Sequence, residues 1–186
     1  TALVRHPEKL PAHANLVAVR ADVHDSAALA EQLRGHDAVL SAFNPGWGQA
    51  DIRAQFIAGS QAIVAATKAA EIRRLLVVGG AGSLEVAPGV RLVTTPNFPP
   101  QYKAEASKGA EFLDLLRQQS DLNWTFLSPS ALFVAGERTG KFRLGTDQLL
   151  TAADGKSSIS FEDFAVALAD EIERPAHLRQ RFTVGY

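Results

Sequence analysis

The most informative stretch of the sequence reads Leu75-Leu76-Val77-Val78-Gly79-Gly80-Ala81-Gly82-Ser83. Its four branched apolar residues predict a strand buried on both faces, as the strands of parallel sheets are. Three glycines and two small residues follow, and glycine lets a ligand approach the backbone closely. Ligands of open parallel sheets bind outside the carboxyl ends of the strands. A simple turn is the alternative, but the other predicted strands end in comparable loops, so the pattern favours a ligand-binding edge.

The composition limits the class of protein. The 186 residues suit one domain, which is predicted to span residues 1–186. With 19 basic and 20 acidic residues the net charge is −1, so neither nucleic acid nor a membrane is an expected partner. The absence of cysteine excludes disulfides, thiol catalysis and thiolate metal sites. The histidines have no metal-ligand spacing either. We therefore expect a cytoplasmic protein that holds no metal.

Strands and helices are predicted to alternate along the chain. The strands fall at residues 1–4, 16–20, 38–42, 75–78 and 123–128, and the helices at residues 26–34, 51–70, 103–119 and 161–173. Asp25 is a predicted N-cap, and Ser160 begins a capping box in which Asp163 replaces glutamate. We expect a small hairpin or excursion at 137–155 and a final edge strand at 181–185. The alternation predicts an α/β fold with a doubly wound parallel sheet.

The beginning of the sequence departs from a dinucleotide-binding fold. Such a fold begins with a strand and a G-x-G-x-x-G turn that seats the pyrophosphate on a helix N-terminus, and this turn is missing. The chain also has no methionine and opens inside an apolar run at Thr1. We therefore expect an incomplete N-terminus, with a strand, a glycine loop and a helix upstream. Because the first strand lies between the second and the fourth, Leu3-Val4 and Val39-Leu40 should face a gap of roughly 10 Å.

Several segments of the sequence resemble those of a known family. They are Val4-Arg5 with Lys9, Asp22-Val23, 77–84, Tyr102-Lys103, 124–129, 136–145 and 181–186. Together they resemble the atypical short-chain dehydrogenase/reductases of the NADH-flavin reductase-like group, over essentially the whole chain. The resemblance implies an NAD(P)-binding Rossmann-like fold, here without its first strand and glycine-rich loop.

The resemblance also implies which residues bind the cofactor. From the adenosine phosphate to the nicotinamide end they are Arg5 and Lys9, Asp22 and Val23, Ser41, Ala42 and Phe43, Gly79, Gly80 and Ala81, and Ser128 and Pro129. An arginine at the end of the second strand accommodates a 2′-phosphate, so Arg5 predicts NADP, with NADPH preferred over NADH. Asp22 has an alternative interpretation as a turn residue.

The acceptor of the hydride is expected to lie over the loop at residues 79–83. We predict that Trp47, Gly82 and Phe133 bind it, because large aromatic side chains form stacking surfaces for planar molecules. Trp47 has an equally good alternative role as a cap over the core. The expected acceptor is a small planar molecule such as a flavin or a quinone.

The tyrosine motif of short-chain dehydrogenases is broken in this sequence. Tyr102 has Ala106 where Tyr-x-x-x-Lys requires lysine, and Lys103 and Lys108 point elsewhere on a helix. No catalytic side chain is therefore predicted, and carbonyl reduction is disfavoured. We predict an NAD(P)H-dependent oxidoreductase that transfers hydride to a planar acceptor, with the protein supplying orientation. The alternative is a non-catalytic NADP-binding redox sensor or regulatory protein.

Overall fold

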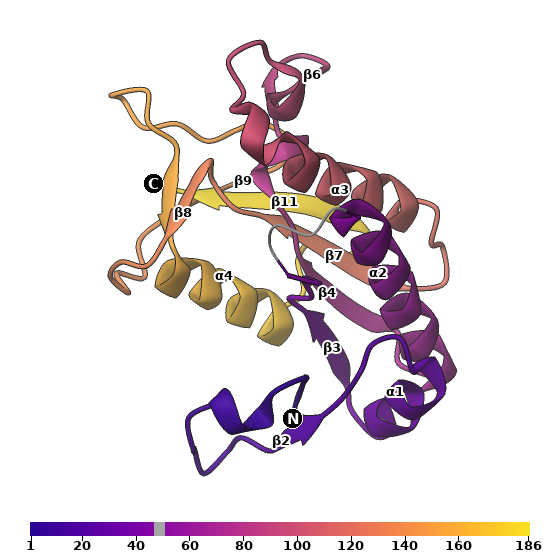
Figure 1. Ribbon diagram of the computed structural model, residues 1–186. Coiled ribbons are helices and arrows are strands. Elements are labelled where there is room, and N and C mark those ends of the chain that lie inside the picture. The colour runs from indigo at the N-terminus through magenta and orange to yellow at the C-terminus, as the bar shows by residue number, and fades with distance from the viewer. Residues whose placement is uncertain (47–50) are drawn as a thin grey trace.

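A five-stranded sheet forms the centre of the protein (Figure 1). The computed structural model describes residues 1–46 and 51–186. The strands of this sheet, in spatial order, are β3 (Ala38–Ser41), β4 (Arg74–Val78), β7 (Asn123–Ser128), β11 (Gln180–Gly185) and β9 (Arg143–Gly145). The first four run parallel, and β9 is antiparallel to β11. The predicted α/β fold with a mostly parallel sheet is confirmed.

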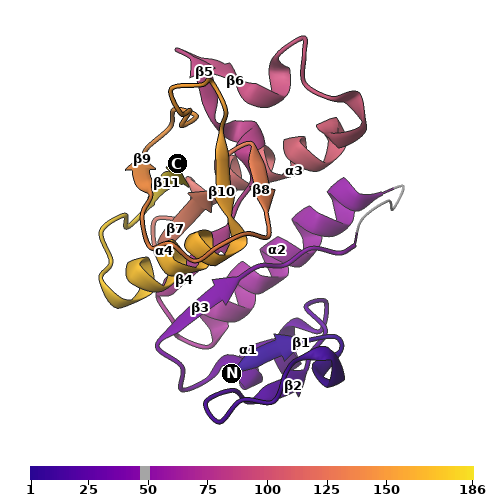
Figure 2. The ribbon, with the colours of Figure 1, turned by 90° about the vertical axis from the view of Figure 1, so that its left-hand side faces the viewer.

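Three two-stranded sheets surround the central one. They are β1 (Ala2–Val4) with β2 (Ala18–Arg20), β8 (Leu132–Val134) with β10 (Ser158–Ser160), and β5 (Glu85–Ala87) with β6 (Val90–Arg91). The first two pairs are parallel and the third is antiparallel. Figure 2 shows the β1–β2 pair beyond β3, and the β8–β10 pair at the opposite flank, near β7.

Helices cover both faces of the central sheet (Figure 1). On one face are α1 (Ser26–Leu33), α2 (Ile52–Ala69) and α3 (Pro100–Leu116), and on the other is α4 (Phe161–Glu173). Three short 3-10 helices, η1 (Pro7–Lys9), η2 (Ala81–Ser83) and η3 (Leu92–Thr94), lie in the connections. Helices on both faces are what right-handed crossovers between parallel strands produce.

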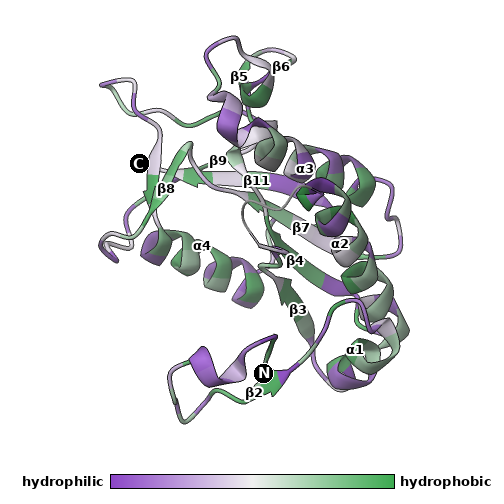
Figure 3. Cartoon of the chain, in the orientation of Figure 1, coloured by the Kyte–Doolittle hydropathy of each residue, from purple (hydrophilic) through white to green (hydrophobic). Residues whose placement is uncertain are grey.

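The strand β4 contributes to two hydrophobic cores at once. Leu75 and Val77 pack with α1, α2 and α3, and Leu76 packs with α4. Because successive side chains of a strand point to opposite faces, a strand covered on both sides must be apolar throughout. Figure 3 shows β3 and β4 as hydrophobic over most of their length. The apolar run at 75–78 is therefore typical of a strand that lies between two layers of helices.

The helix α2 packs against the sheet through one face of apolar residues at helical spacing. Phe56, Ile63 and Ala66 on this face are buried. A side chain at Gly59 would overlap with the ring of Phe43, so glycine permits close approach at this point. The predicted N-cap of α1 is also confirmed, because Asp25 Oδ1 accepts a hydrogen bond of 3.1 Å from the amide of Ala28.

The last third of the chain corrects two of the predictions. Residues 137–155 form the excursion, which was one of the two expected alternatives, and β9 within them pairs with β11. For the same reason β11 is an interior strand and not the predicted edge. Ser160 caps α4 as expected, with its hydroxyl accepting from the amide of Asp163. The Asp163 carboxylate, however, does not complete a capping box, since it accepts from Thr139 and Gly140 in the loop after β8.

Candidate functional site

A cavity of about 960 Å³ separates β1 from β3. The two strands belong to different sheets, as the sequence predicted, and residues of both line the cavity. Apolar side chains such as Leu3, Leu29 and Val39 form much of its wall, and α1 and α2 contribute to it as well. A largely apolar cavity with a few polar groups is typical of a ligand site.

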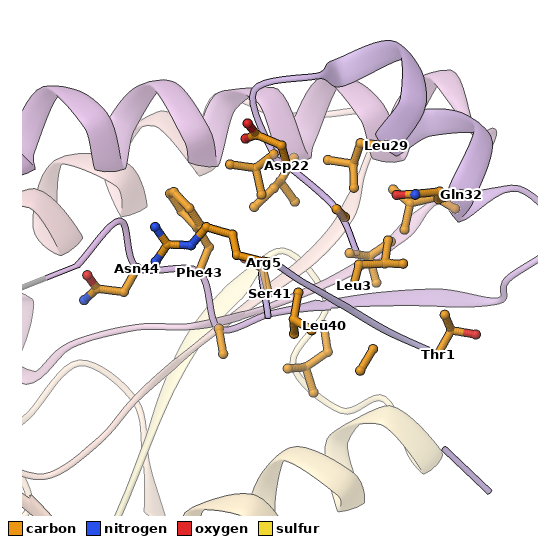
Figure 4. Close-up of a pocket in the computed structure, with 18 of the residues that line it drawn as sticks. Thr1, Leu3, Arg5, Asp22, Leu29, Gln32, Leu40, Ser41, Phe43 and Asn44 are labelled. Carbon is orange, nitrogen blue, oxygen red and sulfur yellow. The ribbon is translucent and has the colours of Figure 1, made fainter. Parts of the chain in front are cut away.

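Six of the predicted cofactor residues meet at this cavity (Figure 4). They come from three strand ends, because Arg5 follows β1, Asp22 follows β2 and Ser41 ends β3. Since parallel strands end at the same edge of a sheet, residues far apart in sequence are brought together. The six are Arg5, Asp22, Val23, Ser41, Ala42 and Phe43.

Arg5 is an exposed cation at the mouth of the cavity. Its side chain points toward the side of the cavity formed by Phe43 and Asn44 (Figure 4). The nearby carboxylate of Glu8 lies 3.0 Å from His6 Nδ1 and 3.6 Å from Arg20 Nη2. A hydrogen bond from the backbone to the Glu8 carboxylate lowers the pKa of Glu8, and the nearby His6 and Arg20 side chains add to this effect. Within residues 1–46 and 51–186, Arg5 itself has no carboxylate at ion-pair distance, so it remains available to an anion.

Asp22 and Phe43 each have a structural contact besides their place in the cavity wall. Asp22 Oδ1 accepts a hydrogen bond of 3.0 Å from the amide of His24, which is the turn role that the sequence left open. The ring of Phe43 stacks on that of Phe56, with centroids 6.1 Å apart. Phe43 is therefore held in place by α2, and it forms a fixed wall of the cavity.

The glycine loop after β4 lies at the neighbouring strand ends. The amide of Gly79 donates a 2.8 Å hydrogen bond to the carbonyl of Leu127, which joins the ends of β4 and β7. A side chain at Gly79 would overlap with the ring of Phe126, and one at Gly82 would lie 2.7 Å from Ala106 Cβ. These two glycines are thus required by packing.

Gly80 differs from its two neighbours in the loop. A side chain built at Gly80 would meet no atom of the described chain within 4 Å. Its backbone is therefore open to a ligand, whereas Gly82 is buried against α3. The expectation of a roomy loop holds for Gly80, and packing explains the other glycines.

Ser128 and Pro129 lie at the end of β7, and both are buried. The Ser128 carbonyl accepts a 2.9 Å hydrogen bond from the hydroxyl of Thr183. The Ser128 hydroxyl is buried and has no hydrogen-bond partner in the part of the chain that the structure describes. A buried polar group without a partner is uncommon, and in a native protein it points to a role such as ligand binding.

Two other predicted residues, Lys9 and Phe133, do not join these groups. Lys9 is exposed on η1 and does not line the cavity. Phe133 packs into the second core, with its ring centroid 4.6 Å from Phe161 and 4.7 Å from Phe164. Trp47 lies outside the described residues.

Lys108 is a buried cation. In the sequence it stands out only as a lysine that lies outside the Tyr-x-x-x-Lys spacing. It is 5% exposed, and its ammonium lies 4.9 Å from the centroid of the Phe56 ring, on the helix that faces Phe43. Tyr102, by contrast, is 55% exposed, so the two side chains do not form a pair. The spacing could have revealed this, because Lys108 lies four residues before Phe112 and hence on the core face of α3.

Membrane-spanning helices and metal-binding clusters are both absent from residues 1–46 and 51–186. No helix there is long and apolar enough to cross a membrane. These residues also include no group of three or more histidine, cysteine or acidic side chains arranged to hold a metal ion.

Residues 1–175 match the family model described as NAD(P)H-binding. The chain belongs to this family. YwnB of Bacillus subtilis, a protein without an assigned function, is 41% identical over 187 residues, which cover 99% of this chain and 85% of YwnB. The sequence resemblance to atypical short-chain dehydrogenase/reductases is thereby confirmed at the level of the family.

Two solved structures are similar to this NAD(P)H-binding protein. One, from Burkholderia pseudomallei, is provisionally named an exported protein, with 43% identity, a TM-score of 0.89, and coverage of 100% of this chain and 86% of that one. The other, from Streptococcus pneumoniae, is provisionally named an NADH-flavin reductase. It has 34% identity, a TM-score of 0.82, and coverage of 99% and 85%. The predicted Rossmann-like fold agrees with both.

The residues present fit the two ends of a nicotinamide dinucleotide. Arg5 offers a cation at the mouth of the cavity, and Gly80 and Ser128 offer open backbone and an unused hydroxyl at the ends of β4 and β7. A G-x-G-x-x-G turn, which would hold the pyrophosphate between these ends, does not occur in the sequence.

Proposed function

We propose that this NAD(P)H-binding protein is a reductase that uses NADPH to reduce a planar, conjugated acceptor such as a flavin or a quinone. The observation that carries the proposal is Arg5, a cation with no carboxylate partner among the described residues, at the end of β1 and the mouth of the cavity. That position is where a 2′-phosphate is read in this class of fold. The name of the Streptococcus relative agrees with a flavin acceptor. We further propose that the reaction is cytoplasmic and that its partner is the small-molecule acceptor, with neither nucleic acid nor a membrane involved.

The protein side chains would bind and orient the reactants in this reaction. Bound NADPH supplies a hydride from C4 of its nicotinamide. Arg5 would bind the 2′-phosphate, and the Ser128 hydroxyl would donate a hydrogen bond to the carboxamide at the other end. The open backbone at Gly80 leaves room for the acceptor to stack. Because Tyr102 is exposed and apart from Lys108, the acceptor would take its proton from solvent.

We propose in addition that one more strand fills the gap between β1 and β3. Among the described residues, β1 pairs only with β2 and β3 only with β4, so each has a free edge toward the cavity, and a strand parallel to both would join the β1–β2 pair to the central sheet. The loop after this strand would supply the missing pyrophosphate site. The test compares residues 1–186 with the natural chain that includes any upstream residues. A cavity that persists in the longer chain would contradict this proposal.

Oxidation of NADPH, followed at 340 nm with FMN, riboflavin and menadione, tests the reductase. Turnover within the usual range of about 1–10³ s⁻¹ with one of these acceptors is the expected result. NADPH binding with turnover far below that range for every acceptor would instead favour the NADP-binding sensor. The exposed Tyr102, which lacks a lysine partner, is the observation that keeps this second function in view.

A further inference from the structure

Arg181 is a buried arginine that hydrogen-bonds to Ser83 at the end of the glycine loop. It lies on β11 and is 7% exposed. Its Nη1 donates to the hydroxyl of Ser83 at 3.2 Å, its Nη2 contacts the Ser83 carbonyl at 3.5 Å, and its Nε donates to Asp147 Oδ1 at 2.8 Å. Burial lowers the pKa of Arg181, although the ion pair with Asp147 opposes this shift. Arginine remains charged in proteins, so these are charge-assisted hydrogen bonds.

Ser83 is the natural point at which to hold this loop. Residues 79–82 are glycines and an alanine, so Ser83 carries the one polar side chain between residues 79 and 83. The loop is otherwise held by backbone hydrogen bonds and by the contacts of Gly79 and Gly82 with Phe126 and Ala106. Arg181 therefore fixes the end of this segment through its one polar side chain.

Asp147 extends the same connection to the chain that follows the loop. Its backbone carbonyl accepts a 2.8 Å hydrogen bond from the amide of Glu85. Its carboxylate also lies 3.7 Å from Arg117 Nη2 on the C-terminal side of α3. Ser83 and Asp147 thus meet at one buried guanidinium, because the fork of arginine can reach both of them at once.

We propose that Arg181 is a positioning residue, which acts through Ser83 to hold the backbone of Gly80 and Ala81 where the nicotinamide and the acceptor bind. The proposal rests on the proposed function, since that function places the reactants at this loop. A displacement of about 1 Å at such a site is enough to slow a reaction considerably, even when the displaced group has no chemical role. Arg181 itself touches no reactant in this account.

Three variants of the full-length protein test the role of Arg181. Arg181→Met removes the guanidinium and should raise the KM for the acceptor about 10- to 100-fold, the effect of losing a charge-assisted hydrogen bond. Arg181→Lys keeps the charge but loses the fork, so we expect a partial rescue. Ser83→Ala deletes one hydroxyl and should raise the KM for the acceptor about tenfold, with little effect on folding.

Arg74→Met is the matched control. Arg74 is a mostly buried arginine of the central sheet, and it pairs with Glu171 at 2.9 Å, but it lies at the start of β4 whereas the glycine loop follows the end of β4. Both methionine variants should therefore lower the melting temperature. Only the Arg181 variant should change the KM, because only Arg181 contacts the loop.

Amide hydrogen exchange at residues 80–83 of the ligand-free protein gives a readout that needs no activity. We expect faster exchange in Arg181→Met and Ser83→Ala than in the wild type or Arg74→Met. If Arg181→Met and Ser83→Ala both left the exchange rates and the KM unchanged, the proposal would be overturned. A wild type that neither binds nor oxidises NADPH would overturn the proposed function instead, and the exchange experiment would still decide whether Arg181 positions the loop.

Discussion

The two flanks of the sheet are built from similar residues but have different surroundings. Leu40 of β3 and Leu76 of β4 are direct register partners, yet Leu40 is 45% exposed and Leu76 is fully buried. We call β4, β7 and β11, with the helices that cover them, the closed half, and β1, β2 and β3 the open half. The closed half has helices on both faces and paired strands on both edges.

The difference separates the most buried part of the protein from its cavity. The closed half holds most of the two cores, although Val39 of β3 also belongs to one of them, while the open half borders the 960 Å³ cavity, which six of the predicted cofactor residues line. An apolar side chain contributes to stability when its neighbours remove it from water, and apolar sequence alone does not achieve this. The following predictions test this division.

Glu171→Gln should have the largest effect, because it breaks a buried ion pair of the closed half. Glu171 Oε1 lies 2.9 Å from Arg74 Nη2, and both side chains are nearly inaccessible. Leaving the arginine buried without its partner costs about 3–5 kcal/mol, measurable by urea unfolding at pH 7. The open half supplies the control, since Glu8→Gln breaks only exposed contacts and should change little. Equal losses in the two variants would contradict the division.

The effect of Glu171→Gln should also depend on pH. Burial by itself raises the pKa of Glu171, but hydrogen bonds from the side chain and amide of His177 and from the amide of Ala176 lower it below 4.5 overall. A lowered folded-state pKa stabilises the protein above the ordinary value and loses this contribution as the pH falls through the folded value. The difference between wild type and variant should therefore shrink below about pH 4.5.

Leu76→Ala compared with Leu40→Ala is the most direct test of the two halves. Deleting a fully buried leucine costs about 2–5 kcal/mol, whereas the half-exposed partner should cost less than about 1 kcal/mol. Urea unfolding of residues 1–186 measures both values. A loss at Leu40 as large as that at Leu76 would mean that another segment or subunit covers the open half in solution.

Arg5→Ala tests the open half as the cofactor site. Loss of a hydrogen-bonded charge should weaken NADPH binding by about 10- to 100-fold and leave NADH nearly unaffected, since NADH has no 2′-phosphate. Fluorescence titration with both cofactors measures the effect. Lys9→Ala is the matched control, because Lys9 is an exposed cation that does not line the cavity. Similar losses for both cofactors would show that Arg5 does not read the 2′-phosphate.

Tyr102→Phe should have the smallest effect. A positioned general acid contributes about 10²–10⁴-fold to kcat, but Tyr102 is 55% exposed and is not paired with Lys108. We expect a loss in kcat below about tenfold with a flavin or quinone acceptor. Trp47→Ala should raise KM by a larger factor. The opposite order would place proton transfer by Tyr102 at the slow step.

Local patterns in the sequence predicted most of the elements. The apolar run at 75–78 and the cap at Asp25 depend on neighbours within a few residues, and both are confirmed. The cavity residues Arg5, Asp22 and Phe43 were named by the family resemblance, and they meet because each follows a strand and parallel strand ends lie at one edge.

The sequence alone therefore determined the alternation of the main strands and helices and the mostly parallel sheet, and it predicted the edge at which a ligand would bind. The tertiary structure decided the features that depend on contacts between distant segments. It assigned Gly79 and Gly82 to packing and left Gly80 open, and it buried Arg181 under a loop almost a hundred residues earlier in the chain. It also made β11 an interior strand, through its pairing with β9. The reason is physical: propensity and periodicity act between near neighbours, whereas burial and pairing depend on which distant segment arrives alongside.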